Sequence, residues 1–95
     1  MKDLKGLLNI SRKAGYLIIG GENIEKHTQK MFVIVLDEKS GNSLKREMTH
    51  ISNDRQIPLL FVQDLEKLIG IENCKSVALK NKALSEEIIK IIKGE

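Results

Sequence analysis

The run over residues 31–36 is the feature that most limits what this chain can fold into, because all six of its residues are apolar. A short run without polar interruptions is typical of a strand that is covered on both faces. Strand-like runs and helical patterns alternate along the rest of the chain, and such an order places helices on both faces of a sheet. The sequence therefore predicts a single domain, residues 1–95, with an α/β fold: a three-layer α/β/α sandwich around a four-stranded mixed sheet.

The expected elements follow from hydrophobic spacing and from the residues that start and stop helices. Helices are predicted over 3–14, 22–29 and 63–69, together with one that contains Leu44, Met48 and Ile51 and a last one that contains Leu84, Ile88 and Ile91 facing inward. Strands are predicted over 16–19, 31–36, 59–62 and 76–79. Asn42 or Ser43 is a plausible N-cap for the third helix, and Asn81 for the last.

Composition fits a small protein with an aliphatic core. Of the 95 residues, 41% are hydrophobic and 31% are charged, which argues against disorder. Only three aromatic residues occur, Tyr16, Phe32 and Phe61, so binding of single strands through several stacked bases is disfavoured. No secretory signal and no run of about 18 apolar residues is visible, so we expect a cytoplasmic protein. The aliphatic inventory suffices for one core, and we expect a monomer.

Basic side chains are concentrated near the start of the chain. Sixteen Lys and Arg against thirteen Asp and Glu give a formal charge of +3, and an excess this small indicates a polyanionic partner only weakly. The first thirteen residues, however, contain a single acid, Asp3, and the basic residues Lys2, Lys5, Arg12 and Lys13.

The junction Ile18-Ile19-Gly20-Gly21-Glu22-Asn23 is the most informative local feature. It leads from a strand through two glycines into a helix, and a helix N-terminus offers free N–H groups to an anion. On spacing alone a tight turn without a ligand is the simpler interpretation, since the pattern is neither a dinucleotide fingerprint nor a P-loop. If the helix ends are adjacent, Arg12, Lys13 and Lys26 surround the turn with cations that could neutralise phosphates. For any one of them a solvated lysine-rich face is the alternative.

Catalytic and metal-binding interpretations have little support. Cys74 has no histidine near it in the sequence, and a single cysteine forms no internal disulfide or zinc cluster. His27 and His50 are twenty-three residues apart, which matches no metal-ligand spacing. Asp37 and Glu38 end a strand, where adjacent acids are more often solvated than metal-bound. We expect a protein that is not an enzyme and that uses no metal or other cofactor.

Sixteen consecutive residues, 7–22, contain a leucine-rich helix, a basic pair, Ala-Gly, a strand and a Gly-x-Glu step. This pattern resembles the opening of the L-seven-Ae ribosomal protein family, and most of all its bacterial YlxQ-type branch. The likeness continues through an apolar strand that ends in acids, and through three later motifs. These are Val33-Ile34-Val35-Leu36-Asp37-Glu38, Ile57-Pro58-Leu59, Leu68-Ile69-Gly70 and Val77-Ala78-Leu79. It spans nearly the whole chain with the elements in matching order.

The resemblance implies an α/β/α sandwich that binds structured RNA, typically a kink-turn. In the family the contacts come from the glycine turn, the start of the second helix and the loop before the last strand. The matching positions are Gly20, Gly21, Glu22, Asn23 and Lys26, and then residues 71–75. Lys26 matches a lysine that contacts a phosphate or a base edge. Cys74 occupies a place where arginine is common, and Lys75 stands next to it.

Two features differ from the family's usual pattern. RNA-binding members begin the second helix with Gly-x-Asn-Glu or Gly-x-Lys-Gln, whereas this chain has Glu22-Asn23. A carboxylate only accepts hydrogen bonds, so Glu22 cannot donate to a guanine O6, and it repels phosphate. The segment between Lys26 and Val33 is also about three residues short, roughly one helical turn. We therefore expect salt-sensitive RNA binding, linked to ribosomal RNA or ribosome assembly, with only modest selectivity for kink-turns.

Two other functions stay open at this point. The first is a protein-interaction module of the same fold with weak or lost RNA binding. The second is a small enzyme or phospho-ligand binder that uses the glycine turn, with Cys74, His27 or Asp37 among its reactive groups. A salt-dependent RNA titration separates the first alternative from RNA binding, and an activity lost on changing those three residues would support the second.

Overall fold

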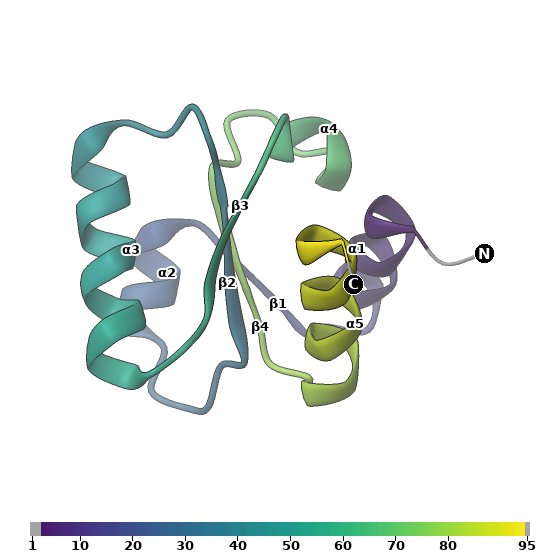
Figure 1. Cartoon of the computed structure of the whole chain (residues 1–95), viewed down its shortest axis with the longest axis horizontal. Helices are drawn as coiled ribbons and strands as arrows, with labels where there is room; N and C mark the ends of the chain where they lie inside the picture. The colour runs from purple at the N-terminus through teal and green to yellow at the C-terminus, as the bar shows by residue number, and fades with distance from the viewer. Residues whose placement is uncertain (1–2, 95) are drawn as a thin grey trace.

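Helices and strands alternate along the chain in the computed structural model, which describes residues 3–94 and so leaves Lys2 of the basic stretch outside. The helices are α1 (Leu4–Lys13), α2 (Gly21–Lys26), α3 (Asn42–Arg55), α4 (Leu65–Ile69) and α5 (Lys82–Lys93). The strands are β1 (Leu17–Ile19), β2 (Val33–Asp37), β3 (Leu59–Val62) and β4 (Ser76–Leu79). Helices α2 and α3 cover one face of the sheet, and α1, α4 and α5 cover the other (Figure 1). The predicted three-layer sandwich is confirmed.

The sheet is mixed, with the strand order β1-β4-β2-β3. β2 and β3 are parallel, whereas β4 runs antiparallel to both of its neighbours, β1 and β2. Consequently β1, β2 and β3 all end at the edge where β4 begins. We call this the upper edge; it contains residues 20–23, 37–40, 63–67 and 70–76, and most of it is at the top of Figure 1. The lower edge, where β1 and β2 begin and β4 ends, contains residues 15–16, 30–32 and 80–82.

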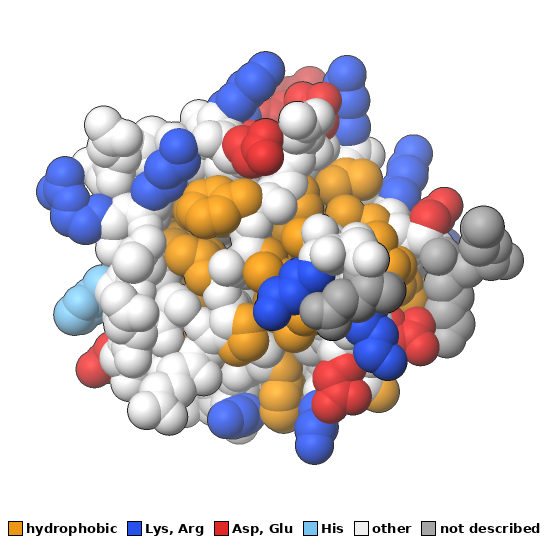
Figure 2. Space-filling view, in the orientation of Figure 1, with side chains coloured by type: hydrophobic (Ala, Val, Ile, Leu, Met, Phe, Trp, Pro, Cys, Tyr) orange, Lys and Arg blue, Asp and Glu red, His pale blue; other side chains and the backbone are white. Residues whose placement is uncertain are grey.

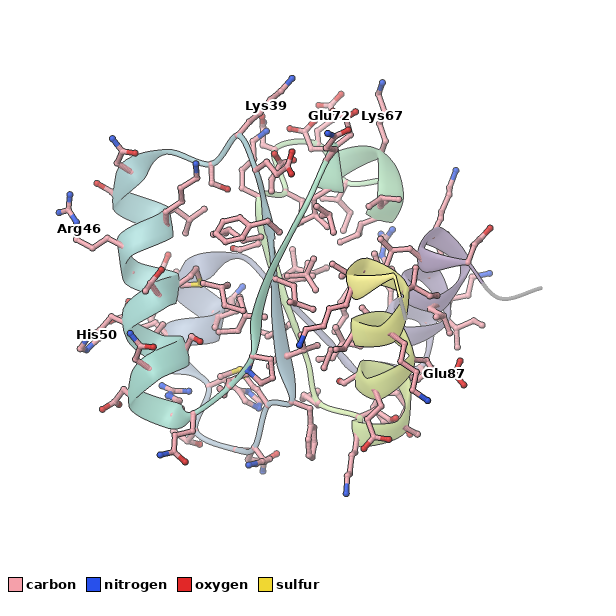
Figure 3. The ribbon with its side chains drawn as sticks, viewed as in Figure 1. Lys39, Arg46, His50, Lys67, Glu72 and Glu87 are labelled. Carbon is pink, nitrogen blue, oxygen red and sulfur yellow. The ribbon has the colours of Figure 1, made fainter. Side chains whose placement is uncertain are left out.

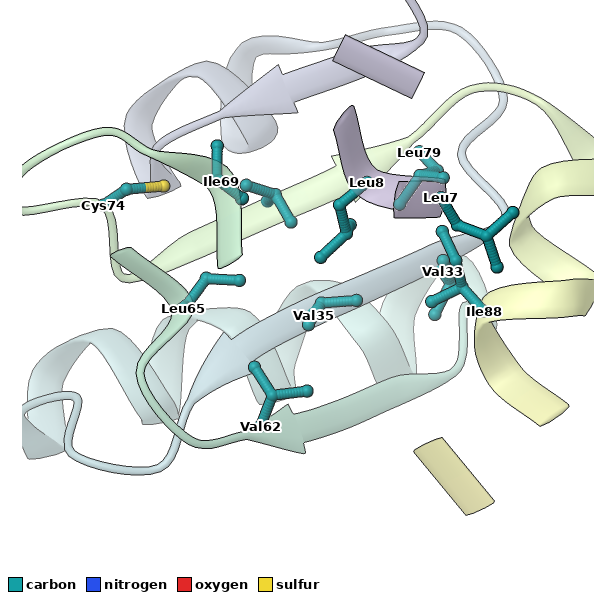
Figure 4. Close-up of a cluster of buried hydrophobic side chains, with 11 residues drawn as sticks. Leu7, Leu8, Val33, Val35, Val62, Leu65, Ile69, Cys74, Leu79 and Ile88 are labelled. Atoms are coloured by element: carbon teal, nitrogen blue, oxygen red, sulfur yellow. The ribbon is translucent and has the colours of Figure 1, made fainter. Parts of the chain in front are cut away.

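The core is divided by the sheet into two clusters. Val33 and Val35 point to the side of α1, α4 and α5, where they pack with Leu8 and Ile88 (Figure 4). The alternate residues of β2 pack on the other side, against α2 and α3; that cluster contains Ile34, Leu36, Ile24, Met48 and Ile51. Every residue of β2 is buried. Residues 33–36 of the apolar run thus belong to a strand that is covered on both faces, as predicted.

The last helix is confirmed, but its inward face differs by one position. The side chain of Asn81 accepts a hydrogen bond from the N–H of Leu84, 2.9 Å away, and so caps α5 as predicted. Ile88 is fully buried, whereas Ile91 is 37% exposed. Ile92, four residues after Ile88, packs against the core instead. The prediction that Ile91 faces inward is therefore wrong.

Several helix boundaries also differ from the sequence prediction: α4 begins at Leu65 rather than at residue 63, and the end of α2 and the N-cap of α3 differ as well. α2 ends at Lys26 rather than at residue 29, and the Arg55 guanidinium of α3 donates to the carbonyls of His27 and Glu25 at this end, at 2.6 Å and 2.9 Å. The N-cap of α3 is Gly41, with no side-chain cap bond, so the prediction of Asn42 or Ser43 is wrong.

Candidate nucleic-acid interface

The upper edge joins the two segments that the family resemblance singles out. The N–H of Gly20 donates to the carbonyl of Ser76 at 2.9 Å, and the N–H of Asp37 donates to the carbonyl of Lys75 at 2.8 Å. The glycine turn and the loop before β4 are therefore neighbours, although more than fifty residues of sequence separate them. Arg12 reaches the same region from the end of α1, where its Nη1 donates to the carbonyl of Ile69 at 3.0 Å.

Each of the two positions in the turn requires glycine for a structural reason. Gly20 has a φ of 93°, a conformation that residues with a side chain rarely adopt. A Cβ on Gly21 would lie 2.8 Å from Cδ1 of Leu44, so this glycine lets α2 approach α3 closely. Asn23 holds the turn, because its Nδ2 donates to the carbonyl of Ile19 at 2.8 Å. The side chain of Asn23 is thus partly engaged, and its Oδ1 is left to accept from a ligand.

Lys26 is already paired in the structure. Its Nζ lies 2.9 Å from Oε1 of Glu22, one turn earlier on α2, and both side chains are more than 70% exposed. This spacing and this order of acid and base favour an ion pair on a helix. Exposed pairs of this kind are weak, so a phosphate can compete with Glu22 for Lys26. The same carboxylate nevertheless reduces the local positive charge.

Lys75 is paired as well, with Glu66 of α4 at an Nζ–Oε1 distance of 3.1 Å. The hydrogen bond to Glu66 and the nearby charge of Asp37 raise the pKa of Lys75 above its ordinary value, so it stays protonated. Lys26 and Lys75 thus each have an acidic partner in the protein alone, which reduces the positive charge that they contribute. Lys13 is exposed at the end of α1 and forms no ion pair with another described residue.

Cys74 is a core residue. It is only 4% exposed, and its Sγ lies 3.8 Å from the carbonyl of Ser76. Burial raises the pKa of the Cys74 thiol above its ordinary value, which makes it a poor nucleophile at neutral pH. The prediction that this side chain contacts RNA is therefore wrong, and Lys75 is the residue of this pair that reaches the surface.

The other candidates for chemistry are placed apart. Asp37 is buried at the end of β2, where its carboxylate accepts backbone hydrogen bonds from Lys39 and Leu65 at 2.8 Å and 2.9 Å. His27 follows α2, whereas His50 is exposed on the outer side of α3 (Figure 3). Within residues 3–94 no three His, Cys, Asp or Glu side chains are grouped so that they could hold a metal ion. No helix in the same range is long and apolar enough to cross a membrane.

Two basic residues of the upper edge escaped the sequence reasoning. Lys39 and Lys67 project outward there, near Glu72 (Figure 3). Lys39 also lines a hollow of about 210 Å³ between the ends of β2 and β3, with Glu38, Gln63 and Asp64 as its other walls. Their place could have been predicted from the sequence, because parallel strands end at one edge of a sheet and the residues that follow each strand meet there.

Comparison with known proteins extends the result on the fold. No protein-family model matches the chain, and no curated protein matches it. Among solved structures, a protein of unknown function from Bacillus halodurans superposes with a TM-score of 0.87 at 21% sequence identity. The match covers 98% of this chain and 99% of that one. At this identity the likeness establishes a shared α/β fold over the full length of both chains.

Proposed function

We propose that this chain is an RNA-binding protein of the ribosomal kink-turn-binder type, and that structured RNA contacts its upper edge. The observation that carries the proposal is the 2.9 Å hydrogen bond between Gly20 and Ser76, which places the glycine turn beside the first residue of β4 and so next to the loop that precedes it. These are the two segments to which the family resemblance assigns the RNA contacts. In this proposal the protein acts as a cytoplasmic monomer on ribosomal or other structured RNA, and it has no catalytic role.

Arg12 and Lys75 are the proposed cations of this interface, with Lys26 on the adjoining helix α2, and Lys39 and Lys67 extend it. Lys13 ends α1 just before residues 15–16 of the lower edge and so lies outside this interface. RNA phosphates would have to compete with Glu22 for Lys26 and with Glu66 for Lys75, because both pairs exist in the protein alone. That competition supports binding that is sensitive to salt and only modestly selective. The N–H groups and the Asn23 side chain at the glycine turn would add contacts that position the RNA.

The second candidate function is a protein-interaction module that uses the same edge. The observation that favours it is the pairing of Lys26 with Glu22 and of Lys75 with Glu66, which leaves a surface of alternating charge. Such a surface can match a protein partner that carries charges of both signs. It is less suited to a polyanion, which gains most from cations without acidic neighbours.

A fluorescence titration separates the two functions. A labelled kink-turn RNA and a straight duplex of equal length are titrated with the protein at two salt concentrations. We expect binding that weakens with salt, with a modest preference for the kink-turn. Lys75→Ala should lower the salt slope by about one unit, as for the loss of one phosphate contact. Arg46→Ala is the charge-matched control, since Arg46 projects from the outer side of α3 (Figure 3).

The outcomes point in different directions. If Lys75→Ala and Arg46→Ala lowered the slope equally, binding would be diffuse and the assignment to the upper edge would fail. If neither RNA bound, and ribosomal RNA did not bind either, the protein-interaction module would be the better description.

A further inference from the structure

The lower edge of the sheet places an aromatic, a basic and a second aromatic residue in a row. In the sheet register, Leu17 and Val33 both lie opposite Leu79. One position further along, Lys80 therefore lies between Tyr16 and Phe32. Hydrogen bonds fix both neighbours: the N–H of Lys80 donates to the carbonyl of Tyr16, and the N–H of Phe32 donates to that of Leu79, each at 2.9 Å. Three strands thus bring together residues that are far apart in the sequence.

The aromatic side chains of this row are accessible, and basic side chains flank them. Tyr16 is 38% exposed, and Phe32 is partly exposed. The Nζ of Lys30 lies 5.8 Å from the centroid of the Phe32 ring, within the range of a cation–π contact. Lys82, the first residue of α5, lies two positions after Lys80. Figure 2 shows basic side chains next to hydrophobic ones along the lower rim, with an acidic group among them.

The cations of the lower edge differ in their partners from two of those near the upper edge. Lys30, Lys80 and Lys82 are exposed, and none of them forms an ion pair with another described residue. At the upper edge Lys75 is paired with Glu66, and on the adjoining helix Lys26 is paired with Glu22, whereas Lys39 and Lys67 form no ion pair with another described residue. Unpaired ammonium groups attract phosphates without first having to give up an acidic partner. The lower edge therefore offers exposed cations that a polyanion can reach without displacing an acid.

We propose that the lower edge binds single-stranded RNA, with Tyr16 and Phe32 stacking on bases and Lys30 and Lys80 contacting phosphates. Accessible aromatic rings next to cations are the combination that single strands require, because their bases are unstacked and their faces are free. A duplex offers only its phosphates to such a surface. Two rings accommodate about two bases, and selectivity among them is low because every base has a stacking face.

This surface is separate from the proposed kink-turn interface. The five residues of β2 that lie between the two edges span about 17 Å. Only the choice of RNA over DNA as the ligand rests on the proposed function. A single-stranded RNA segment that continues from a structured RNA element at the upper edge could reach the lower edge across the side of the protein. The protein would then bind one RNA at two places.

The test uses the fact that the chain contains one tyrosine and no tryptophan, so its tyrosine emission reports on Tyr16 alone. Titration with a short oligouridine should quench this emission, whereas a duplex of equal absorbance, which corrects for absorbed light, should not. With a labelled oligouridine, Tyr16→Ala should weaken binding by roughly five-fold or more, as for one lost stacking contact. Lys80→Ala should lower the salt slope by about 0.7, the value for one phosphate of a single strand.

Matched variants decide the interpretation. Phe61→Ala removes an exposed aromatic ring from β3, and Arg46→Ala removes an exposed cation from α3; neither should change the affinity for oligouridine. Phe32→Leu keeps an apolar side chain at a partly buried position, so the fold should survive, as a thermal melt can check, while binding weakens. Absent quenching, or an equal loss of affinity in Phe61→Ala, would overturn the proposal. If oligouridine quenched the tyrosine emission and the lower-edge variants alone lost affinity, but the protein did not bind kink-turn RNA, the proposed function would be rejected and this inference would stand.

Discussion

The carboxylate of Asp37 accepts a hydrogen bond from the N–H of Leu65 at 2.9 Å, so a residue at the end of β2 caps the first turn of α4. Asp64, which directly precedes α4, makes no side-chain cap bond and has a φ of 51°. The other carboxylate oxygen of Asp37 accepts from the N–H of Lys39 at 2.8 Å. One buried carboxylate thus fixes the loop after β2 and the start of α4, which both contribute to the upper edge.

Asp37→Asn should therefore destabilise the protein. The amide that replaces the carboxylate leaves one backbone N–H facing a donor, and hydrogen bonds to a charged acceptor contribute about 1.5–3 kcal/mol each. We expect a loss of about 2 kcal/mol, which corresponds to a fall in the melting temperature of roughly 8–16 °C for a domain of this size. Asp64→Asn is the control, since Asp64 is exposed and Asn tolerates its left-handed backbone conformation. Circular dichroism melts measure both; equal melting temperatures would contradict the capping role.

The same carboxylate makes stability depend on pH. Burial alone would raise the pKa of Asp37, but the hydrogen bonds from Lys39 and Leu65 and the charge of Lys75 outweigh it and lower the pKa below its ordinary value. A group with a lowered pKa in the folded state stabilises the fold above its unfolded pKa, about 3.9 for Asp. This stabilisation is lost as the pH falls from about 3.9 through the lower value of the folded state.

The measurement is urea unfolding at neutral pH and at several values below about 4. The difference in unfolding free energy between the unaltered protein and Asp37→Asn should be largest at neutral pH and should shrink as acid is added. A difference that stayed constant down to low pH would show that Asp37 does not titrate in this range.

Most of the fold was predictable because its signals are local. The strand predictions over 59–62 and 76–79 agree with β3 and β4, since short apolar runs there are bounded by Pro58 and Asn81. The contact of Arg55 with the end of α2 was not predictable, because the two are nearly thirty residues apart in sequence. The exposure of Ile91 depends on how α5 rotates against the sheet, and the hydrophobic spacing of α5 allows more than one rotation.

The candidate site divides in the same way. The pair of Glu22 and Lys26 was available from the sequence, because residues four apart on a helix are neighbours. The pair of Lys75 and Glu66 and the burial of Cys74 were not available, because both depend on how α4 packs beside the start of β4. The sequence indicated which segments meet at the upper edge, but it could not say which of their side chains face the solvent.

The packing of α5 can be tested with two isoleucines of the same helix. Ile88 is fully buried and Ile91 is 37% exposed. Ile88→Ala should cost about 2–5 kcal/mol, the usual cost of removing a buried Ile side chain, and Ile91→Ala considerably less. Both variants keep the same helix propensity change, so their difference isolates burial. Equal losses in chemical denaturation would show that the α5 face is wrongly assigned.

The glycine turn can be tested with two glycines of different conformation. Gly20 has a φ of 93°, whereas Gly41 has a φ of −66° and open space where a Cβ would lie. Gly20→Ala should therefore cost about 1–3 kcal/mol through backbone strain, and Gly41→Ala should be close to neutral. Thermal melts compare the two. A neutral Gly20→Ala would mean that the turn adopts another conformation in solution.

The sharpest prediction concerns the pair of Glu22 and Lys26 in RNA binding. Glu22→Asn removes the carboxylate that repels phosphate and pairs with Lys26, and it supplies a donor for a guanine edge. We expect it to strengthen kink-turn binding by about 1 kcal/mol or more. Lys26→Ala should weaken binding and lower the salt slope by about one unit. Glu25→Asn, which changes an exposed acid on the same helix, is the matched control and should have a smaller effect.

A double-mutant cycle then tests whether the ion pair restrains Lys26. If Glu22 competes with phosphate, Lys26→Ala should cost more affinity in the Glu22→Asn background than in the unaltered protein, because the lysine is freed in that background. Additive effects would mean that Lys26 contacts RNA without leaving Glu22. Tight kink-turn binding by the unaltered protein, weakened by Glu22→Asn, would show instead that the carboxylate accepts a hydrogen bond from the RNA, such as one from a guanine amino group, and that Glu22 is a recognition residue.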